Sequence, residues 1–212
     1  IDLKERSNQP MKFNDNILIF NGEIYNYLEL RKILLRKGYT FYTKSDTEVL
    51  LKCYSEFGEK TNSYLEGMWS YAIYDIKKSK LILSRDRFGE KPLFYSKIGN
   101  NFFFGSEIKY IKSLSNKSFQ LNTKKIINFC SHGYRNLKSN NKTFYDNIYS
   151  LNPGTNLIIN KKFDFRFKKY WIIKIKETND NEKKSVSKIK QILYKNLEKK
   201  FRSDVPLAFC LS

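Results

Sequence analysis

Four short runs of residues, all rich in aromatic and β-branched side chains, most constrain what this chain can fold into. They cover residues 68–75, 80–85, 93–97 and 101–106, and turn-forming residues separate each run from the next. Runs of this length and spacing are typical of antiparallel strands joined by tight connections. The sequence therefore predicts an antiparallel meander, whose core can draw on the 17 Phe and 15 Tyr of the chain.

Hydrophobic periodicity and capping signals predict the elements on either side of this meander. The tetrad Ser45-Asp46-Thr47-Glu48 fits a capping box, which opens a helix that reaches Phe57. Asn21-Gly22 is a turn signal that closes an apolar strand. The remaining predicted elements are strands over 16–20, 40–42 and 205–211, a hairpin over 155–160 and 163–175, and helices over 27–37, 107–114, 123–132 and 186–201.

A polar break near 176–182 divides the chain into two parts. Before it, helices accompany mostly antiparallel strands, which argues against a doubly wound parallel sheet. After it, a basic helix and a continuous apolar strand look like the start of a parallel, nucleotide-binding α/β domain. We therefore predict a first domain over 1–176 and the beginning of a second over 177–212. Because the chain starts at Ile1 and stops inside a predicted strand, we expect it to be a fragment.

The chain is strongly basic, with 40 Lys and Arg against 21 Asp and Glu and a formal net charge of +19. Lys supplies 32 of the 40 basic residues, whereas a phosphate-reading surface favours the bidentate fork of Arg. Lys, Asn and Ile are abundant and share A/T-rich codons, so we interpret the charge as genome composition spread over solvated faces. No nucleic-acid-binding motif accompanies it, and we predict no nucleic-acid partner. A local electrostatic role for the basic segment 161–200 stays open.

Cysteine usage and hydropathy exclude further classes. Cys53, Cys130 and Cys210 are too few and too scattered for a disulfide framework or a metal cluster, so we predict no metal site and a reducing, cytoplasmic location. No run of about 18 apolar residues occurs, so we expect no membrane span. Cys53 and Cys130 lie in predicted helices and are interpreted as packed thiols. His132, the single histidine, ends a predicted helix and receives no role.

Three polar features could carry chemistry. Asn21-Gly22 offers a side-chain amide beside an accessible backbone N–H, as an oxyanion hole requires, although Asn-Gly alone is more often a hairpin turn. Asp46 could hold a substrate ammonium, or it could simply be a first-turn acid favoured by the helix dipole. Residues 85–92 mix charges of both signs around Gly89 and Pro92, which favours a rigid turn held by ion pairs.

Together these features resemble a known family. Five motifs occur in the same order as in the class II glutamine amidotransferase domain of the glutamine-hydrolysing asparagine synthases. They are Asn-Gly-Glu-Ile-Tyr-Asn at 21–26, Ser-Asp-Thr-Glu at 45–48, Gly-Met-Trp-Ser at 67–70, Ser-Arg-Asp-Arg-Phe-Gly-Glu-Lys-Pro-Leu at 84–93 and Ser-Glu-Ile-Lys at 106–109. The resemblance implies an α+β fold, the four-layer αββα sandwich of N-terminal-nucleophile hydrolases with antiparallel sheets. The first helix and strand of an α/β ATP-pyrophosphatase domain would follow.

The same resemblance implies a glutaminase site. In the family a Cys at the mature N-terminus attacks the glutamine amide, with its own α-amine as the base. Asn21 and Gly22 would form the oxyanion hole and contact glutamine, together with Ile1, Glu23 and Asp46. The nucleophilic Cys would stand before Ile1 and is absent from the 212 residues. None of the cysteines in the chain carries the free α-amine that this chemistry needs, so we expect the chain to be inactive alone.

The resemblance also implies the wider reaction, in which glutamine, aspartate and ATP give asparagine, glutamate, AMP and pyrophosphate. Cys210 and Ser212 would begin the ATP-binding loop, and Mg²⁺ would accompany ATP in the full-length enzyme. The glutaminase part would bind no cofactor, and the enzyme could be a homodimer. Two alternatives remain: a related class II amidotransferase with another acceptor carboxylate or partner domain, and a non-enzymatic basic binding module.

Overall fold

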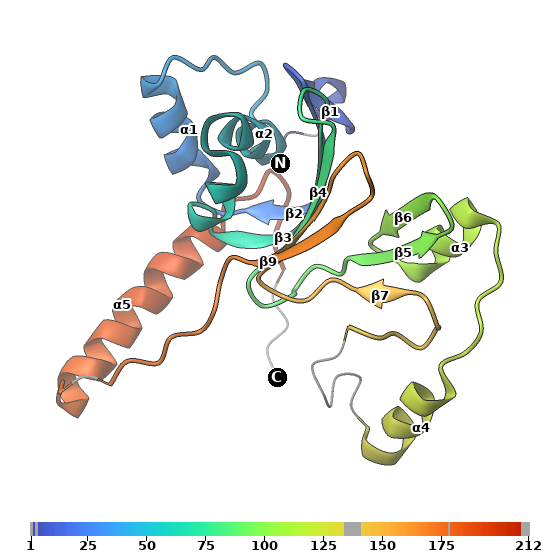
Figure 1. Ribbon diagram of the computed structural model, residues 1–212. Helices are drawn as coiled ribbons and strands as arrows, with labels where there is room; N and C mark the ends of the chain where they lie inside the picture. The colour runs from blue at the N-terminus through green and yellow to red at the C-terminus, as the bar shows by residue number, and fades with distance from the viewer. Residues whose placement is uncertain (1, 3, 134–140, 178, 209–212) are drawn as a thin grey trace.

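Two antiparallel β-sheets lie face to face at the centre of the computed structural model, which describes all residues except 1, 3, 134–140, 178 and 209–212 (Figure 1). The larger sheet has six strands in the order β1 (Met11–Phe13), β2 (Asn16–Ile24), β3 (Gly67–Asp75), β4 (Lys80–Arg85), β8 (Thr155–Ile159) and β9 (Phe165–Lys169). The smaller sheet has three strands in the order β6 (Asn101–Gly105), β5 (Phe94–Ile98) and β7 (Tyr149–Ser150).

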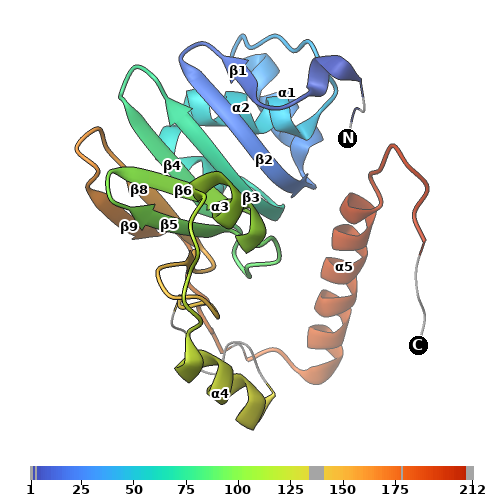
Figure 2. The same cartoon turned by 90° about the vertical axis from the view of Figure 1, so that its right-hand side faces the viewer.

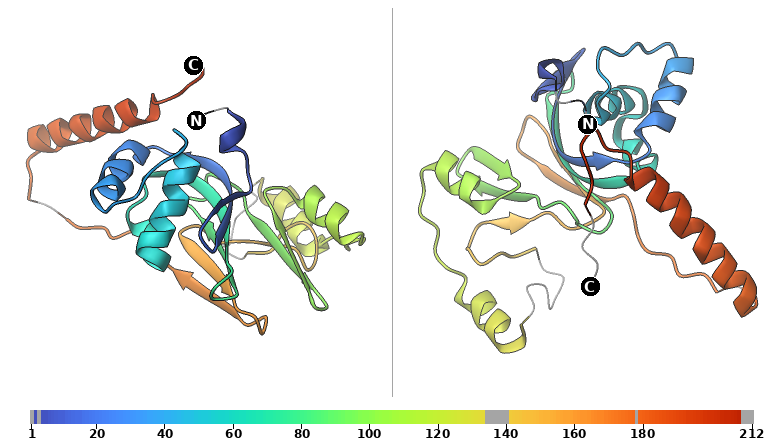
Figure 3. Two further views of the ribbon diagram at one scale, coloured as in Figure 1. Left: turned by 90° about the horizontal axis from the view of Figure 1, so that it is seen from above. Right: turned by 180° about the vertical axis from the view of Figure 1, so that it is seen from behind.

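Helices cover the two outer faces and complete four layers. Helix α2 (Asp46–Phe57) packs on the larger sheet with α1 (Tyr27–Arg36) against it, and α3 (Ile108–Ser115) packs on the smaller sheet. This order, which Figure 3 shows from above and behind, confirms the predicted αββα sandwich. The other helical elements are the 3₁₀ helices η1 (Glu5–Ser7) and η2 (Gly58–Ser63), then α4 (Thr123–His132) and α5 (Glu182–Lys200), the last standing beside the sheets in Figure 2.

Strand β3 separates two hydrophobic cores because its side chains alternate between the sheet faces. Trp69, Tyr71 and Ile73 point toward α1 and α2 and are buried with Leu50 in the first core. Ala72, between them, belongs to the second core, which lies between the two sheets. The residues of β2 follow the same alternation, so Asn21 lies on the face that looks toward the smaller sheet.

The predicted meander is correct in its strands and wrong in one of its pairings. Strand β3 pairs with β4 and β5 pairs with β6, but β4 does not pair with β5. Instead β4 pairs with β8, and the chain crosses to the other sheet between residues 85 and 94. Strand spacing reports local connections only, and the partner of β4 lies more than seventy residues away in sequence.

Asn21-Gly22 is not a turn, which corrects the prediction that the strand ends at residue 20. β2 continues to Ile24, with Gly22 opposite Trp69. A Cβ at Gly22, where φ is +153°, would lie 2.1 Å from the carbonyl oxygen of Met68, and one at Gly67 would lie 2.1 Å from that of Glu23. Glycine is required here because the two backbones approach closely within the sheet.

Several smaller expectations need correction. Residues 40–42 form no strand, and the predicted strand over 163–175 shortens to β9. Cys53 is fully buried as predicted, whereas Cys130 is exposed on α4. The predicted helix over 186–201 is present and begins earlier, at Glu182. In the predicted strand over 205–211, residues 205–208 are not in a strand and the rest lie outside the described residues.

Hydrogen bonds hold the turn between β4 and β5, and among the described residues no ion pair joins its charged side chains, which corrects the prediction of a turn held by ion pairs. The Asp86 side chain is fully buried, and its Oδ1 accepts hydrogen bonds from the N–H groups of Phe88 (3.0 Å), Gly89 (2.7 Å) and Glu90 (3.0 Å). Its Oδ2 accepts from two more backbone N–H groups, on Lys91 at 2.9 Å and Trp69 at 3.3 Å. Arg85 donates to the carbonyl oxygens of Gly89, Lys91 and Leu151.

We predict that Asp86→Asn destabilises the protein by about 2–4 kcal/mol, because the amide group replaces an acceptor and leaves buried N–H donors unpaired. Urea unfolding of the variant and the wild type measures this difference. Asp146→Asn is the matched control at an exposed position, where a change within about 0.5 kcal/mol is expected. A loss of the same small size in Asp86→Asn would contradict the role assigned to this carboxylate.

Candidate functional site

Asn21 lies in a pocket between the two sheets. Its side-chain amide donates a 3.0 Å hydrogen bond to the hydroxyl of Ser106, which follows the end of β6. The pocket has a volume of about 160 Å³, and Asn21 and Ser106 line it together with Ser70, Leu93 and Phe104. Asn21 therefore lines a small open space beside Ser106, and an oxyanion hole would need its amide to donate into that space.

Asp46 brings the start of α2 to the end of β2. Its side chain is buried, and its Oδ2 accepts a 3.0 Å hydrogen bond from the N–H of Ile24. Burial raises the pKa of this carboxyl, although the Ile24 N–H acts in the opposite direction. Ile24 follows Glu23 directly, and the Glu23 side chain is exposed on the face of β2 that also carries Asn21. The fold thus places both predicted carboxylates at one end of β2.

The predicted capping box forms only by half. The Ser45 hydroxyl accepts from the Glu48 N–H at 3.2 Å, as a helix cap should. The Glu48 carboxylate, however, turns away from Ser45 and accepts from the Thr43 N–H and hydroxyl, both at 2.7 Å, and from the Tyr42 N–H at 3.0 Å. Glu48 therefore anchors residues 42–43, the irregular segment that leads into Asp46.

Lys52 completes this anchor from inside the protein. Its side chain is 1% exposed, and its ammonium lies 2.6 Å from Glu48 Oε1. It also donates to the carbonyl oxygen of Thr40 and lies within about 5 Å of the ring centres of Phe13 and Phe41. A buried charge is tolerated only with such partners, so this pair joins α2 to the preceding segment.

The other residues considered in the sequence are the cysteines, His132 and the two chain ends. Ile1, Cys210 and Ser212 lie outside the described residues. Burial raises the pKa of the Cys53 thiol to about 12, so this thiol is protonated at neutral pH. His132 lies on α4, with its Nδ1 3.0 Å from the carbonyl oxygen of Asn128.

Ser106 and Lys52 were not predicted from the sequence as site residues; Ser106 bonds Asn21, and Lys52 holds Glu48, which anchors the segment leading into Asp46. Ser106 lies in one of the five motifs and at the end of a predicted strand. That position could have indicated a site residue. Lys52 lies on a helix four residues after Glu48, a spacing that predicts an i,i+4 pair. Its burial depends on Phe13 and Phe41, which approach from distant parts of the chain.

In the described part of the chain, no helix is long and apolar enough to span a membrane. Among the same residues, no three His, Cys, Asp or Glu side chains are grouped closely enough to hold a metal ion.

Comparison with known proteins identifies relatives. Residues 1–171 match the family model of the glutamine amidotransferase domain. The chain is 35% identical over 210 residues to asparagine synthetase [glutamine-hydrolyzing] 1 of Bacillus subtilis, covering 98% of this chain and 33% of that protein. It is 33% identical over 231 residues to putative asparagine synthetase [glutamine-hydrolyzing] 2 of Methanocaldococcus jannaschii, covering 100% of this chain and 44% of that protein. The chain thus spans one third to under one half of these relatives.

Solved structures share the fold. Glutamine phosphoribosylpyrophosphate amidotransferase from B. subtilis, solved with ADP and GMP, superposes with a TM-score of 0.56 at 21% identity. The match covers 78% of this chain and 32% of that one. An allosteric regulatory enzyme of purine biosynthesis superposes with a TM-score of 0.58, also at 21% identity, over 79% of this chain and 32% of that one. The sandwich of this chain is the N-terminal-nucleophile fold that the resemblance implied.

We predict that Lys52→Met destabilises the protein by about 3–5 kcal/mol, because it leaves the buried Glu48 carboxylate without its counter-charge. Lys60→Met, at an exposed position, is the matched control. Thermal or urea unfolding at neutral pH measures both, and equal, small losses would contradict the prediction.

The stability of Lys52→Met should also depend less on pH than that of the wild type. Burial opposes ionisation of Glu48, but the hydrogen bonds from Lys52 and Thr43 outweigh it and hold the pKa of Glu48 below its ordinary value. A lowered pKa contributes stability above the ordinary glutamate value, and this stability is lost as the pH falls through the lowered value. We expect the wild type to lose more stability than Lys52→Met over that range.

Proposed function

The chain belongs to the glutamine amidotransferase domain family, and on this premise we propose that it is the glutaminase part of a glutamine-dependent asparagine synthase. The proposed domain comprises residues 1–176, and residues 177–212 begin a synthetase domain. The observation that carries the proposal is the placement of Asn21 on the pocket face of β2, with Asp46 joined to the end of the same strand.

The proposed reaction begins when a thiolate attacks the side-chain carbonyl carbon of glutamine. Negative charge then develops on the carbonyl oxygen, where the Asn21 amide and the Gly22 N–H donate hydrogen bonds. Collapse of the tetrahedral intermediate releases ammonia and leaves a thioester, which water hydrolyses to glutamate. The nucleophile is a Cys that we expect to precede Ile1, with its α-amine as the base. The chain alone is therefore inactive.

Glu23 and Asp46 are the proposed contacts for the α-ammonium group of glutamine. A charge-assisted contact needs the ionised carboxylate, and burial works against ionisation of Asp46. A bound ammonium would favour the ionised form, because an opposite charge nearby lowers a carboxyl pKa. Ile1 would line the same pocket.

Ammonia would then be consumed by the remainder of the proposed enzyme, where aspartate is activated with ATP and Mg²⁺. Cys210 and Ser212 are the proposed first ATP contacts of that part. The names of the relatives from B. subtilis and M. jannaschii support aspartate as the acceptor. A related amidotransferase with another acceptor is the second candidate, because the chain is also 27% identical over its whole length to amidase chyE of Penicillium rubens.

We predict that Asn21→Ala lowers the rate of glutamate release from glutamine by about 100-fold or more in the product of the complete reading frame, because one oxyanion donor is lost. A coupled glutamate assay under saturating glutamine measures the rate. The 212-residue chain, assayed in parallel, should release no glutamate above background.

Asn100→Ala is the control, since Asn100 is exposed in the turn between β5 and β6. It should retain the wild-type rate within about twofold. Asn21→Ala with a near-normal rate removes Asn21 from the mechanism, and release of glutamate by the isolated chain overturns the proposed inactivity. Asparagine formation from aspartate and ATP by the complete protein separates the first candidate acceptor from the second.

A further inference from the structure

The residues after α5 return to the strand that carries Asn21. The Arg202 guanidinium donates to the two carboxylate oxygens of Glu29, both at 2.7 Å, and to the carbonyl oxygen of Tyr25 at 2.9 Å. Tyr25 directly follows Ile24, the last residue of β2, and Glu29 lies in the first turn of α1. The Arg202 side chain thus binds both ends of the connection between β2 and α1.

A second contact holds the opposite side of the same connection. The Lys199 ammonium donates to the carboxylate of Glu66, which directly precedes β3. The backbone of Glu66 accepts a 2.8 Å hydrogen bond from the Tyr25 N–H. Lys199 and Arg202 therefore contact the two partners of a single backbone hydrogen bond at the end of the β2–β3 pair.

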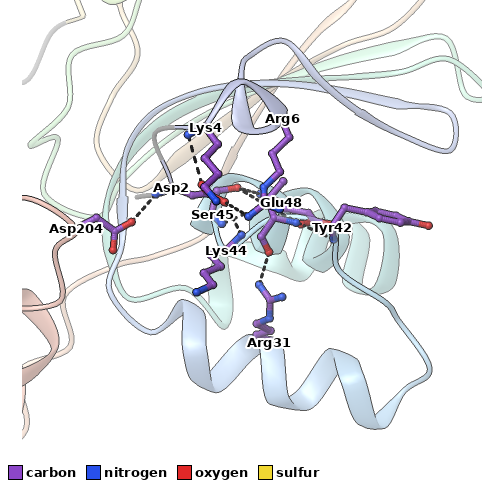
Figure 4. Close-up of polar contacts among 10 residues, drawn as sticks. Asp2, Lys4, Arg6, Arg31, Tyr42, Lys44, Ser45, Glu48 and Asp204 are labelled. Atoms are coloured by element: carbon purple, nitrogen blue, oxygen red, sulfur yellow. Dashed lines mark hydrogen bonds and ion pairs between the residues drawn. The ribbon is translucent and has the colours of Figure 1, made fainter.

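A third contact reaches the segment that carries Asp46. Asp204 accepts a 2.7 Å hydrogen bond from the Asp2 N–H, and the Asp2 carboxylate in turn accepts a 2.8 Å hydrogen bond from the Lys44 N–H. Figure 4 shows Asp2 between Asp204 and the Lys44–Ser45 backbone. The Asp2 side chain is only 5% exposed, and the Lys44 N–H is the main cause of its lowered pKa. Lys44 stands two residues before Asp46.

We propose that residues 199–204 are a latch that sets the geometry of the glutamine site from the start of the following domain. Arg202 and Lys199 fix the end of β2, and Asp204 acts through Asp2 on the approach to Asp46. Arg202 is a positioning residue, because it contacts the supports of the site rather than the pocket. The assignment of a glutamine site rests on the proposed function, whereas the contacts themselves do not.

The rest of α5 makes little apolar contact with the sheets, so the contacts of residues 199–204 matter for its position. The apolar side chains of the helix remain exposed, with Ile189 at 65% and Leu193 at 56%. Figure 2 shows the helix standing away from the sheets along most of its length, with its C-terminal end turned toward the body. Leu193 and Leu197 line a cavity with Phe88, and the hydrogen bonds to the body come from Lys199, Arg202 and Asp204. Consistent with a close pair, Arg202 lowers the pKa of Glu29 to about 2.

Hydrogen exchange followed by mass spectrometry tests the latch in the 212-residue chain and in the complete protein. In Arg202→Gln we expect amide exchange over residues 24–30 to become about fivefold faster or more, because opening at the strand end is no longer opposed. Lys195→Gln removes a charge from an exposed position of the same helix and should leave that peptide unchanged. The charge swap of Arg202→Glu with Glu29→Arg should recover part of the lost protection.

Kinetics of the complete protein provide the readout that a merely structural contact would not move. We expect Arg202→Gln to raise KM for glutamine about fivefold or more with kcat within about twofold, the pattern of weakened substrate binding. Unchanged exchange over 24–30 overturns the latch. Faster exchange with unchanged KM overturns its effect on the site.

The two proposals fail in different ways. If the wild-type complete protein releases no glutamate, the proposed function is wrong, and the assigned role of the latch in glutamine binding is wrong with it. A response of residues 24–30 to Arg202→Gln in that same protein would still support the contact between the two segments. Normal glutamate release with no exchange response supports the proposed function and overturns the latch alone.

Discussion

The close approach of the β2 and β3 backbones at Gly22 and Gly67 is the constraint on which the rest of the site depends. A Cβ at either glycine would meet the facing carbonyl oxygen at 2.1 Å, so only glycine lets the ladder run on to Ile24. Because the ladder continues, the alternation of side chains also continues. Asn21 is therefore delivered to the face between the sheets, and the Ile24 N–H is left at the strand end, where Asp46 accepts from it.

Local sequence patterns predicted most of the elements, and the reason is visible in particular residues. Gly133, in the left-handed conformation, ends α4 at His132 as expected, and the Ser45 cap begins α2 at Asp46. The errors occur where distant residues decide. Asn-Gly has the same local preference in a turn and in a strand, and only the facing Met68–Trp69 backbone makes it a strand. The partner of β4 is likewise set by β8, far along the chain.

Two buried carboxylates, Asp86 and Glu48, accept hydrogen bonds from several backbone N–H groups, which the sequence did not predict. Asp86 accepts hydrogen bonds from five backbone N–H groups, four in the turn and one in the adjacent strand β3. Glu48 accepts hydrogen bonds from the N–H groups of Tyr42 and Thr43. A carboxylate placed in this way compensates for its own burial and fixes a segment that has no regular secondary structure. A dense run of charges is compatible both with ion pairs and with hydrogen bonds from charged side chains to the backbone. Composition alone therefore could not tell which of the two forms. The five motifs gave better guidance, since each of them contains a residue of the pocket or its supports.

The C-terminal end of β2 contacts both Asp46 and the segment 199–204. This explains how a segment distant in sequence can act on the candidate site. The connection after β2 is held by the Tyr25–Glu66 backbone hydrogen bond and by Asn26, whose side chain bonds the backbone of Tyr64 and Glu66. These polar contacts hold the connection between the buried residues Ile24 and Leu30. Lys199 and Arg202 act on that connection from both sides. A shift of the C-terminal end of α5 would therefore act on the end of β2 through these hydrogen bonds.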